Sequence, residues 1–114
     1  MPNIEIKLKT DNTELIKQAT RQAVRVALEA VGLQAENNTK TQITKVGAVD
    51  TGRLRNSITH TSDEDTAYVG TNVEYAAYVE YGTSKMAARP YLKPAVNNNA
   101  AQYRAIFEDF LRNA

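Results

Sequence analysis

The sequence predicts an α+β fold in a single domain that covers residues 1–114. Three patterns support this prediction: an N-terminal stretch in which apolar and charged residues alternate, a long stretch of helical periodicity, and two central strand-like stretches separated by four polar residues. A chain of 114 residues commonly forms one hydrophobic core, whereas two shorter pieces would each bury little apolar surface.

The composition restricts the class of protein. A hydrophobic fraction of 42% with 24% charged residues is ordinary for a globular domain. The chain has no cysteine, which excludes disulfides, thiolate nucleophiles and the common cysteine-based zinc sites. The formal net charge of +1 lacks the basic excess of a dedicated nucleic-acid binder. Because there is no long apolar run and no signal-peptide pattern, we expect neither a membrane span nor secretion by that route.

The first predicted element is a strand at residues 3–9. Apolar and charged side chains alternate from Ile4 to Lys9, and this period of two is typical of a half-buried strand.

A long helix is predicted to begin at residues 10–13, which are all N-cap candidates. Asp11 followed by Glu14 resembles a capping box. Apolar residues then recur at alternating steps of three and four, as in a helical seam: Ile16, Ala19, Ala23, Val26, Ala30 and Leu33. Further apolar residues widen this seam and predict burial on more than one side: Val24, Leu28 and Val31.

The second half of this helix is polar. Between residues 34 and 45 only Ala35 and Ile43 are apolar, so we expect this half to face water or a polar partner. Gly47 is predicted to end the helix, because glycine adopts the left-handed conformation without a Cβ penalty.

A turn and a hairpin are predicted in the centre of the chain. In the turn, Asp50 or Thr51 can bond the backbone, and Gly52 is expected to take a positive φ. Residues 54–61 and 66–70 then resemble two strands joined by polar residues 62–65. Three residues are expected to pack in the core here: Ile58, Tyr68 and Val69.

Residues 73–81 predict a short helix without a polar face, which needs a cover on two sides. Two interpretations of Tyr75 and Tyr78 stay open, a core position and an interface position. Tyrosine is favoured where one end of the side chain is dry and the other is wet. Gly82 is predicted to end this helix.

A loop and a last helix complete the chain. Residues 83–88 predict a flexible loop, and Arg89, Pro90 and Tyr91 precede a helix whose first turn tolerates Pro94. The apolar face of this helix is predicted from Ala95, Val96, Ala101, Ala105, Ile106, Phe110 and Leu111. Its middle is expected to be loose, because residues 97–99 are asparagines.

The sequence offers little catalytic chemistry. His60 is the only histidine and is expected to be structural or exposed. The acidic residues 63–65 lack the spacing of a calcium loop and are expected to form a solvated hairpin tip. Glu74 and Glu80 lie about 120° apart on a helix, so they form no obvious carboxylate pair. We predict no catalytic, cofactor-binding or metal-binding residue and no enzyme; a hydrolase using His60 and Asp63 is the minor alternative.

Four motifs follow one another from residue 49 to residue 95: VDTGRLRNSI, YVGT, YAAYVEYGT and ARPYLKPA. In this order they resemble a family of small tail-component proteins of long-tailed bacteriophages, described as minor tail, tail-completion or head-to-tail joining proteins. Each motif alone is unspecific. The combination of D-T-G-x-L, E-Y-G-T and R-P-Y-L-x-P-A carries more information than any one of them.

The resemblance implies a small antiparallel sheet, formed by the N-terminal strand and the central hairpin, with a long N-terminal helix packed on it. A short central helix and a C-terminal helix complete this expected fold. The candidate interface residues are Asp50, Thr51, Gly52, Arg53, Leu54, Tyr78, Tyr81, Gly82, Thr83, Lys85, Arg89, Pro90 and Tyr91. The resemblance leaves open whether the motif residues make contacts or determine the fold.

The resemblance also implies a structural virion protein at the head-tail junction, made in the bacterial host cytoplasm. We expect it to be a tail-completion or head-to-tail joining subunit with no cofactor and no membrane partner. The expected partners are further copies in a ring, for which we expect a hexamer, together with phage neck and tail-tube proteins. DNA would pass through the ring lumen, and a near-neutral subunit is compatible with a weakly interacting lining.

A small nucleic-acid-binding or regulatory module is the alternative from a different class. It would use Arg53, Arg55, Lys85 and Arg89 as a basic patch. Its binding to DNA would weaken steeply as salt rises, because phosphate contacts release counterions.

Overall fold

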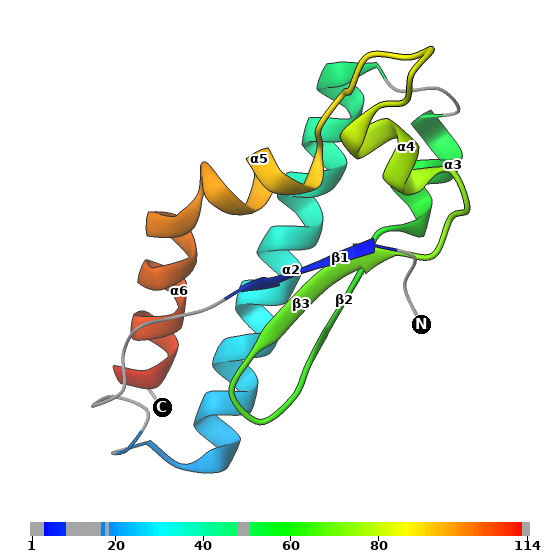
Figure 1. The fold of residues 1–114 in the computed structure, drawn as a ribbon. Helices are drawn as coiled ribbons and strands as arrows, with labels where there is room; N and C mark the ends of the chain where they lie inside the picture. Colours follow the sequence, from blue (N-terminus) through cyan, green and yellow to red (C-terminus); the bar gives the residue numbers. More distant parts are fainter. Residues whose placement is uncertain (1–3, 9–16, 18, 48–50, 113–114) are drawn as a thin grey trace.

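The computed structural model describes residues 4–8, 17, 19–47 and 51–112, and every structural statement refers to these residues. Three strands and five helices follow one another in this part of the chain (Figure 1): β1 (Ile4–Leu8), α2 (Arg21–Val46), α3 (Thr51–Ser57), β2 (Thr59–Ser62), β3 (Ala67–Thr71), α4 (Ala76–Tyr81), α5 (Leu92–Asn97) and α6 (Ala100–Arg112).

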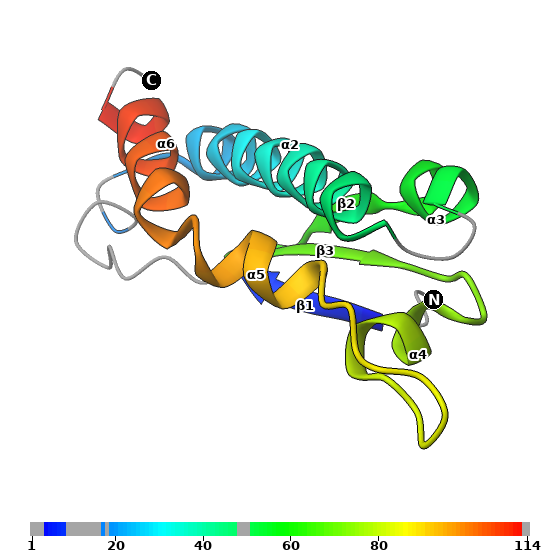
Figure 2. The same ribbon diagram turned by 90° about the horizontal axis from the view of Figure 1, so that it is seen from above.

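The strands form one antiparallel sheet in the order β1-β3-β2. Val69 at the centre of β3 pairs with Ile6 of β1 on one side and with His60 of β2 on the other. Helix α2 packs on β2, β3, α5 and α6. In Figure 2, α2 lies on one side of β3 and α4 lies on the other. The predicted α+β fold, a small antiparallel sheet packed by a long helix, is therefore confirmed.

Helix α2 begins later than the sequence predicts. Its N-cap is Thr20, whose backbone is extended at φ −73° and ψ 159° and whose hydroxyl accepts a 3.0 Å hydrogen bond from the Ala23 N–H. The prediction of one uninterrupted helix that begins at residues 10–13 is therefore wrong. Residues 10–13 themselves lie outside the described ranges. The predicted end is confirmed, because Gly47 takes the left-handed conformation with φ 62°.

The buried face of α2 also differs from the predicted seam. Val26 and Leu33 are 43% and 48% exposed, so their prediction as core residues is wrong. The predicted burial of Ala23, Val24, Leu28 and Val31 is confirmed. They belong to a buried stripe that continues into the polar half of the helix: Ala23, Val24, Ala27, Leu28, Val31, Gly32, Ala35, Thr39 and Ile43. The hydroxyl of Thr39 is satisfied in the core because it donates a 2.7 Å hydrogen bond to the Ala35 carbonyl.

Helix α3 replaces the predicted turn and the first part of the predicted strand. Gly52 is helical, and among the described glycines only Gly47 and Gly82 have a positive φ. Leu54 is fully buried, so packing on the core favours a helix where the local sequence indicates a turn. Strand β2 therefore begins only at Thr59.

The predicted hairpin is confirmed with shorter strands. Ile58 and Val69 are buried as expected, whereas Tyr68 is only half-buried and donates a 2.7 Å hydrogen bond from its hydroxyl to Asp63. The side chain of Asp63 also accepts the N–H groups of Asp65 and Thr66 at 3.0 and 2.9 Å, which closes the exposed tip.

The predicted last helix consists of two helices, α5 and α6, separated at Asn98 and Asn99. This break agrees with the expected loose middle. Ala95, Val96 and Leu111 are buried as predicted, and Ile106 is half-buried. Three predicted face residues are instead exposed: Ala101, Ala105 and Phe110. Tyr103 and Phe107 take their place in the core, because they follow the same four-residue step as Leu111.

Candidate functional site

Helix α4 presents two tyrosines to solvent. Tyr78 is 59% exposed and Tyr81 is 56% exposed, whereas Ala76 and Val79 are buried. The helix is shorter than predicted, since Tyr75 is its N-cap. Only one side of it is covered by the fold, and the aromatic side remains open.

Glu80 anchors the covered side of α4. Its side chain is buried, and its carboxylate accepts the N–H groups of Tyr91, Leu92 and Lys93 at 3.1, 2.8 and 3.2 Å. These N–H groups lie at the start of α5, where backbone N–H groups have no acceptor within the helix itself. Glu80 therefore acts as a long-range cap that fixes α4 against α5.

Tyr91 belongs to the core and not to an open surface. It is fully buried, and its hydroxyl donates a 2.8 Å hydrogen bond to the Ala76 carbonyl. Burial, followed by the negative charge of Glu80, raises the pKa of Tyr91 well above its ordinary value of 10.0. Leu54, another candidate interface residue, is also fully buried. In this structure both residues determine the fold, and neither is available as a contact.

Gly82 allows the chain to turn directly into the next loop. Its φ of 77° and ψ of 177° lie in a region that is essentially restricted to glycine. A Cβ at this position would lie 2.7 Å from the Ala88 backbone nitrogen and 2.9 Å from the Met86 carbonyl oxygen. The two sides of the loop can approach each other only because residue 82 has no side chain.

Residues 83–90 form a loop that projects from the body of the molecule (Figure 2). Thr83 and Met86 exchange backbone hydrogen bonds of 2.8 and 3.3 Å, so the tip has a defined turn. The C-terminal end of the loop is held by Arg89. The backbone N–H of Arg89 donates a 2.8 Å hydrogen bond to the Val79 carbonyl, and the Arg89 guanidinium donates a 2.7 Å hydrogen bond to the Gly47 carbonyl.

Most loop side chains are open to solvent. Four candidate interface residues are among the exposed ones: Thr83, Lys85, Arg89 and Pro90. The other exposed residues are Ser84, Ala87 and Ala88.

Helix α3 lies at the same end of the molecule as α4 and the loop (Figure 1). Its Arg53 donates two hydrogen bonds of 2.9 and 2.8 Å to the Glu74 carboxylate and lies 5.4 Å from the Tyr75 ring centroid. The bonds from Arg53 lower the pKa of Glu74. This contact joins α3 to the turn before α4. Gly52 is exposed in the same helix, whereas Asp50 and the side chain of Thr51 lie outside the described part.

The predicted basic patch is gathered at this end but is largely engaged within the chain. Arg53 is paired with Glu74, and Arg55 donates to the Thr44 hydroxyl at 3.1 Å. Arg89 donates to the carbonyl of Gly47, the C-cap of α2, and the C-terminal end of a helix attracts positive charge. Lys85 is exposed in the loop. Three of the four side chains thus have a structural role, which does not favour a dedicated DNA-binding patch.

We define the aromatic-loop surface as Tyr78 and Tyr81 of α4 together with the exposed residues of loop 83–90. Lys93 extends it, because its ammonium lies 4.9 Å from the centroid of the Tyr81 ring. This surface combines apolar, aromatic and cationic groups on a rigidly anchored helix and an adjacent projecting loop. Such a combination is typical of protein interfaces.

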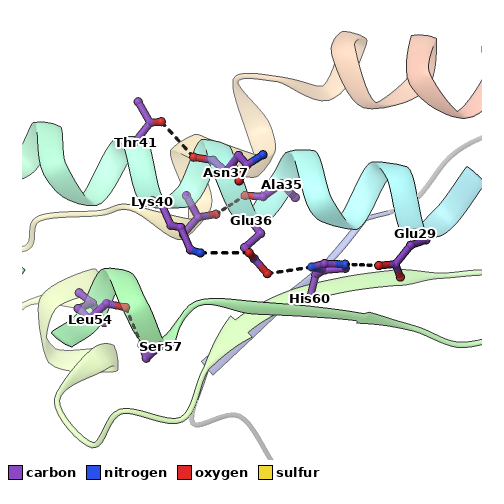
Figure 3. Close-up of polar contacts among 10 residues, drawn as sticks. Glu29, Ala35, Glu36, Asn37, Lys40, Thr41, Leu54, Ser57 and His60 are labelled. Atoms are coloured by element: carbon purple, nitrogen blue, oxygen red, sulfur yellow. Dashed lines mark hydrogen bonds and ion pairs between the residues drawn. The ribbon is translucent and has the colours of Figure 1, made fainter. Parts of the chain in front are cut away.

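His60 makes contacts that the sequence did not indicate (Figure 3). Its ring nitrogens lie 2.9 Å from Glu36 and 2.7 Å from Glu29, both on α2. Asp63 instead bonds Tyr68 and the backbone of the hairpin tip, so the structure does not bring His60 and Asp63 together as a catalytic pair.

Within the described ranges, no group of three or more histidine, aspartate or glutamate residues could hold a metal ion. None of the helices there combines the length and the hydropathy that a bilayer crossing requires.

Glu80 and His60 are the two site residues that sequence reasoning missed. Their partners lie 11 to 31 residues away along the chain, so no local pattern reveals them. The one usable signal for Glu80 is the lack of a capping side chain at Tyr91, which leaves the start of α5 in need of a distant acceptor.

Comparison with known proteins identifies a family. The family model described as "Bacteriophage HK97-gp10, putative tail-component" matches residues 4–82, which is more than half of the chain. The match includes the D-T-G-x-L motif and the helix that ends at Gly82, whereas the loop and the R-P-Y motif lie beyond it. Searches of curated proteins and of solved structures returned no match. The chain therefore belongs to the HK97-gp10-like family of bacteriophage tail components.

Proposed function

We propose that this tail component is a tail-completion or head-to-tail joining subunit that acts in a homo-oligomeric ring at the head-tail junction. We expect the ring to be a hexamer. The role is structural and involves no enzymatic step. The observation that carries the proposal is the aromatic-loop surface, which is anchored by Glu80 and left uncovered by the chain's own fold.

The exposed tyrosines support an assembly role. Tyr78 and Tyr81 are large side chains that keep more than half of their surface in water. Their burial by a partner would remove apolar surface from water while the hydroxyls could still find hydrogen-bond partners. Because α4 is already fixed against α5, little conformational entropy would be lost when they are covered.

A second exposed apolar pair supports a ring. Val26 and Leu33 lie two helical turns apart on the solvent side of α2, on a different element from the aromatic-loop surface. Head-to-tail assembly requires two different patches on each subunit, and it closes into a ring when the rotation between neighbours closes. The two patches are therefore the pair of faces that such a ring would use.

The projecting loop suggests how the subunit engages different partners. Thr83 and Met86 exchange backbone hydrogen bonds at its tip, and most of its side chains are exposed. The loop itself extends beyond the body of the molecule (Figure 2). We propose that this loop contacts phage neck or tail-tube proteins while helices contact neighbouring subunits. DNA would pass through the lumen without tight binding, in keeping with the engaged state of Arg53, Arg55 and Arg89.

Electron microscopy of lysates tests this role. A stop codon in place of Tyr75, in the phage or prophage that carries the gene, removes α4 and everything after it. We expect filled heads separate from finished tails if the subunit joins them, and tails of uncontrolled length if it completes the tail. A plasmid that supplies the intact chain is the control and should restore particles. Intact, infectious particles without the complementing plasmid would contradict the proposal.

A further inference from the structure

His60 bridges two carboxylates of α2 through its two ring nitrogens (Figure 3). Nδ1 lies 2.9 Å from Glu36 Oε1, and Nε2 lies 2.7 Å from Glu29 Oε1. The two glutamates lie seven residues apart, so they project from the same side of the helix two turns apart. The imidazole lies between them and connects edge strand β2 to α2.

The ring is held in this position by close packing. Gly32 lies beneath it, and a Cβ on residue 32 would approach the His60 Cδ2 to 2.8 Å. The His60 side chain is 15% exposed. A ring confined in this way cannot exchange its carboxylate partners freely, so its protonation state decides how many of the contacts are hydrogen bonds.

A neutral imidazole carries a single N–H, and an ionised carboxylate can only accept. Both contacts are hydrogen bonds only when His60 is the doubly protonated imidazolium. We propose that protonated His60 is a latch that fastens the β2–β3 hairpin to α2, and that loss of its proton opens the half of the latch formed with Glu29.

The surroundings of the ring favour the charged form. On α2, Glu29 and Glu36 face it, and Lys40 binds the second oxygen of Glu36 at 3.1 Å. On β3 the paired residue is the apolar Val69, and Ala67–Thr71 contains no charged side chain. At the tip of the same hairpin, the Asp63 carboxylate accepts a hydrogen bond from the Tyr68 hydroxyl. Among the residues that the structure describes, no positive charge contacts the ring and opposes its protonation.

The pKa shifts agree with this geometry. Burial lowers the pKa of His60, but hydrogen bonds to Glu29 and Glu36 and attraction to both carboxylates outweigh it, so the pKa lies above 6.5. Burial also raises the pKa of Glu36, and the bonds from His60 and Lys40 more than offset this. The stabilisation by the latch is therefore complete between about pH 4.5 and pH 6.5. It is lost as pH rises through the raised pKa of His60, and it is lost again as pH falls through the lowered pKa of Glu36.

Unequal burial identifies the half that opens. The Glu29 side chain is 64% exposed and can turn into water, whereas the Glu36 side chain is 16% exposed and is also held by Lys40. The last proton should therefore stay on Nδ1, against Glu36. The contact with Glu36 sets this neutral tautomer. In the alternative Nε2–H form, the Glu36 carboxylate would face the lone pair of Nδ1.

Nitrogen NMR of the intact chain tests the latch, and its signals need no assignment because the chain has one histidine. We expect both ring nitrogens to be protonated well below pH 6.5, a titration midpoint above 6.5, and an Nδ1–H neutral form. Glu36→Gln should lower the midpoint and convert the neutral form to Nε2–H. Glu29→Gln should lower the midpoint and keep Nδ1–H.

Glu64→Gln, which removes an equal charge at the exposed hairpin tip, is the matched control and should change neither property. A midpoint at or below 6.5, or an Nε2–H neutral form in the unmodified chain, would overturn the proposal. Amide protection in β2, corrected for the intrinsic exchange rate, gives a second readout. It should fall several-fold across the titration in the unmodified chain, and a pH-independent protection would also overturn the latch.

Discussion

At the scale of single residues, two glycines of the sequence motifs have opposite roles. Gly82 holds a positive φ of 77° where a side chain would strike the backbone of Met86 and Ala88. Gly52 lies in helix α3 without a positive φ, and an added Cβ would meet nothing within 4 Å. The first glycine is required by the geometry of the loop, whereas the second is a weak point in a helix.

Alanine at these positions should therefore change stability in opposite directions. Gly82→Ala should lower the free energy of unfolding by about 1–3 kcal/mol, because of backbone strain and contact with the loop. Gly52→Ala should raise it by about 0.5–1 kcal/mol, because alanine loses less conformational freedom in a helix. Urea unfolding of both variants measures the two changes. A loss of stability in Gly52→Ala would mean that residue 52 needs the turn conformation that its sequence suggests.

At the scale of elements, Glu80 connects α4 to the start of α5. Its buried carboxylate accepts three backbone N–H groups, and the N-cap residue Tyr91 makes no capping hydrogen bond with its own side chain. The exposed tyrosines of α4 depend on this connection for their position. The aromatic-loop surface is thus fixed by a residue that does not belong to it.

Glu80→Ala should lower the free energy of unfolding by about 2–4 kcal/mol, because it leaves buried N–H groups without acceptors. Glu80→Gln should cost less, since the amide oxygen remains an acceptor. Urea unfolding and amide exchange at residues 91–93 provide the measurement. Glu64→Ala, at the exposed hairpin tip, is the control and should leave the free energy of unfolding nearly unchanged. Equal stability of Glu80→Ala and the unmodified chain would contradict the capping role.

Patterns with strong local signals predicted their elements correctly. The alternation in β1, the hairpin, and the ends of α2 at Gly47 and α4 at Gly82 all depend on residues close in sequence. Helix α3 could not be predicted, because the turn-like residues before Leu54 are overridden by the burial of that leucine. The exposure of Val26 and Leu33 could not be predicted, because apolar residues surround much of α2 and only tertiary packing selects the stripe that includes Leu28 and Ala35.

The site was predicted only in part for the same reason. The sequence left open whether Tyr75 and Tyr78 are core or interface positions, and a helical wheel cannot distinguish them. Tyr75 is half-buried and packs against the core. The structure exposes Tyr78 and Tyr81, while it buries Tyr91, which lies in an adjacent motif. This difference depends on how α4 meets α5, and that arrangement rests on the long-range bonds of Glu80.

At the scale of the whole molecule, the chain is elongated, with principal extents of 50 × 25 × 22 Å. Helices α3 and α4 and the projecting loop lie at the end where α2 ends (Figure 1). Val26 is exposed in the first half of α2, whereas this group of elements lies where the helix ends. A rod-like subunit with different apolar patches at separate places suits head-to-tail contact with its neighbours, which is the basis of the ring that we propose.

Complementation of the stop-codon phage by Tyr78→Ser/Tyr81→Ser tests the central claim most directly. Both tyrosines are exposed, so the variant should fold like the unmodified chain, and circular dichroism checks this. We predict that it fails to restore infectious particles, by at least tenfold, because the aromatic-loop surface has lost its anchors. Phe110→Ser, which alters an exposed aromatic residue on α6, is the control and should complement normally. Full complementation by the folded double variant would show that assembly does not use this surface and would contradict the account.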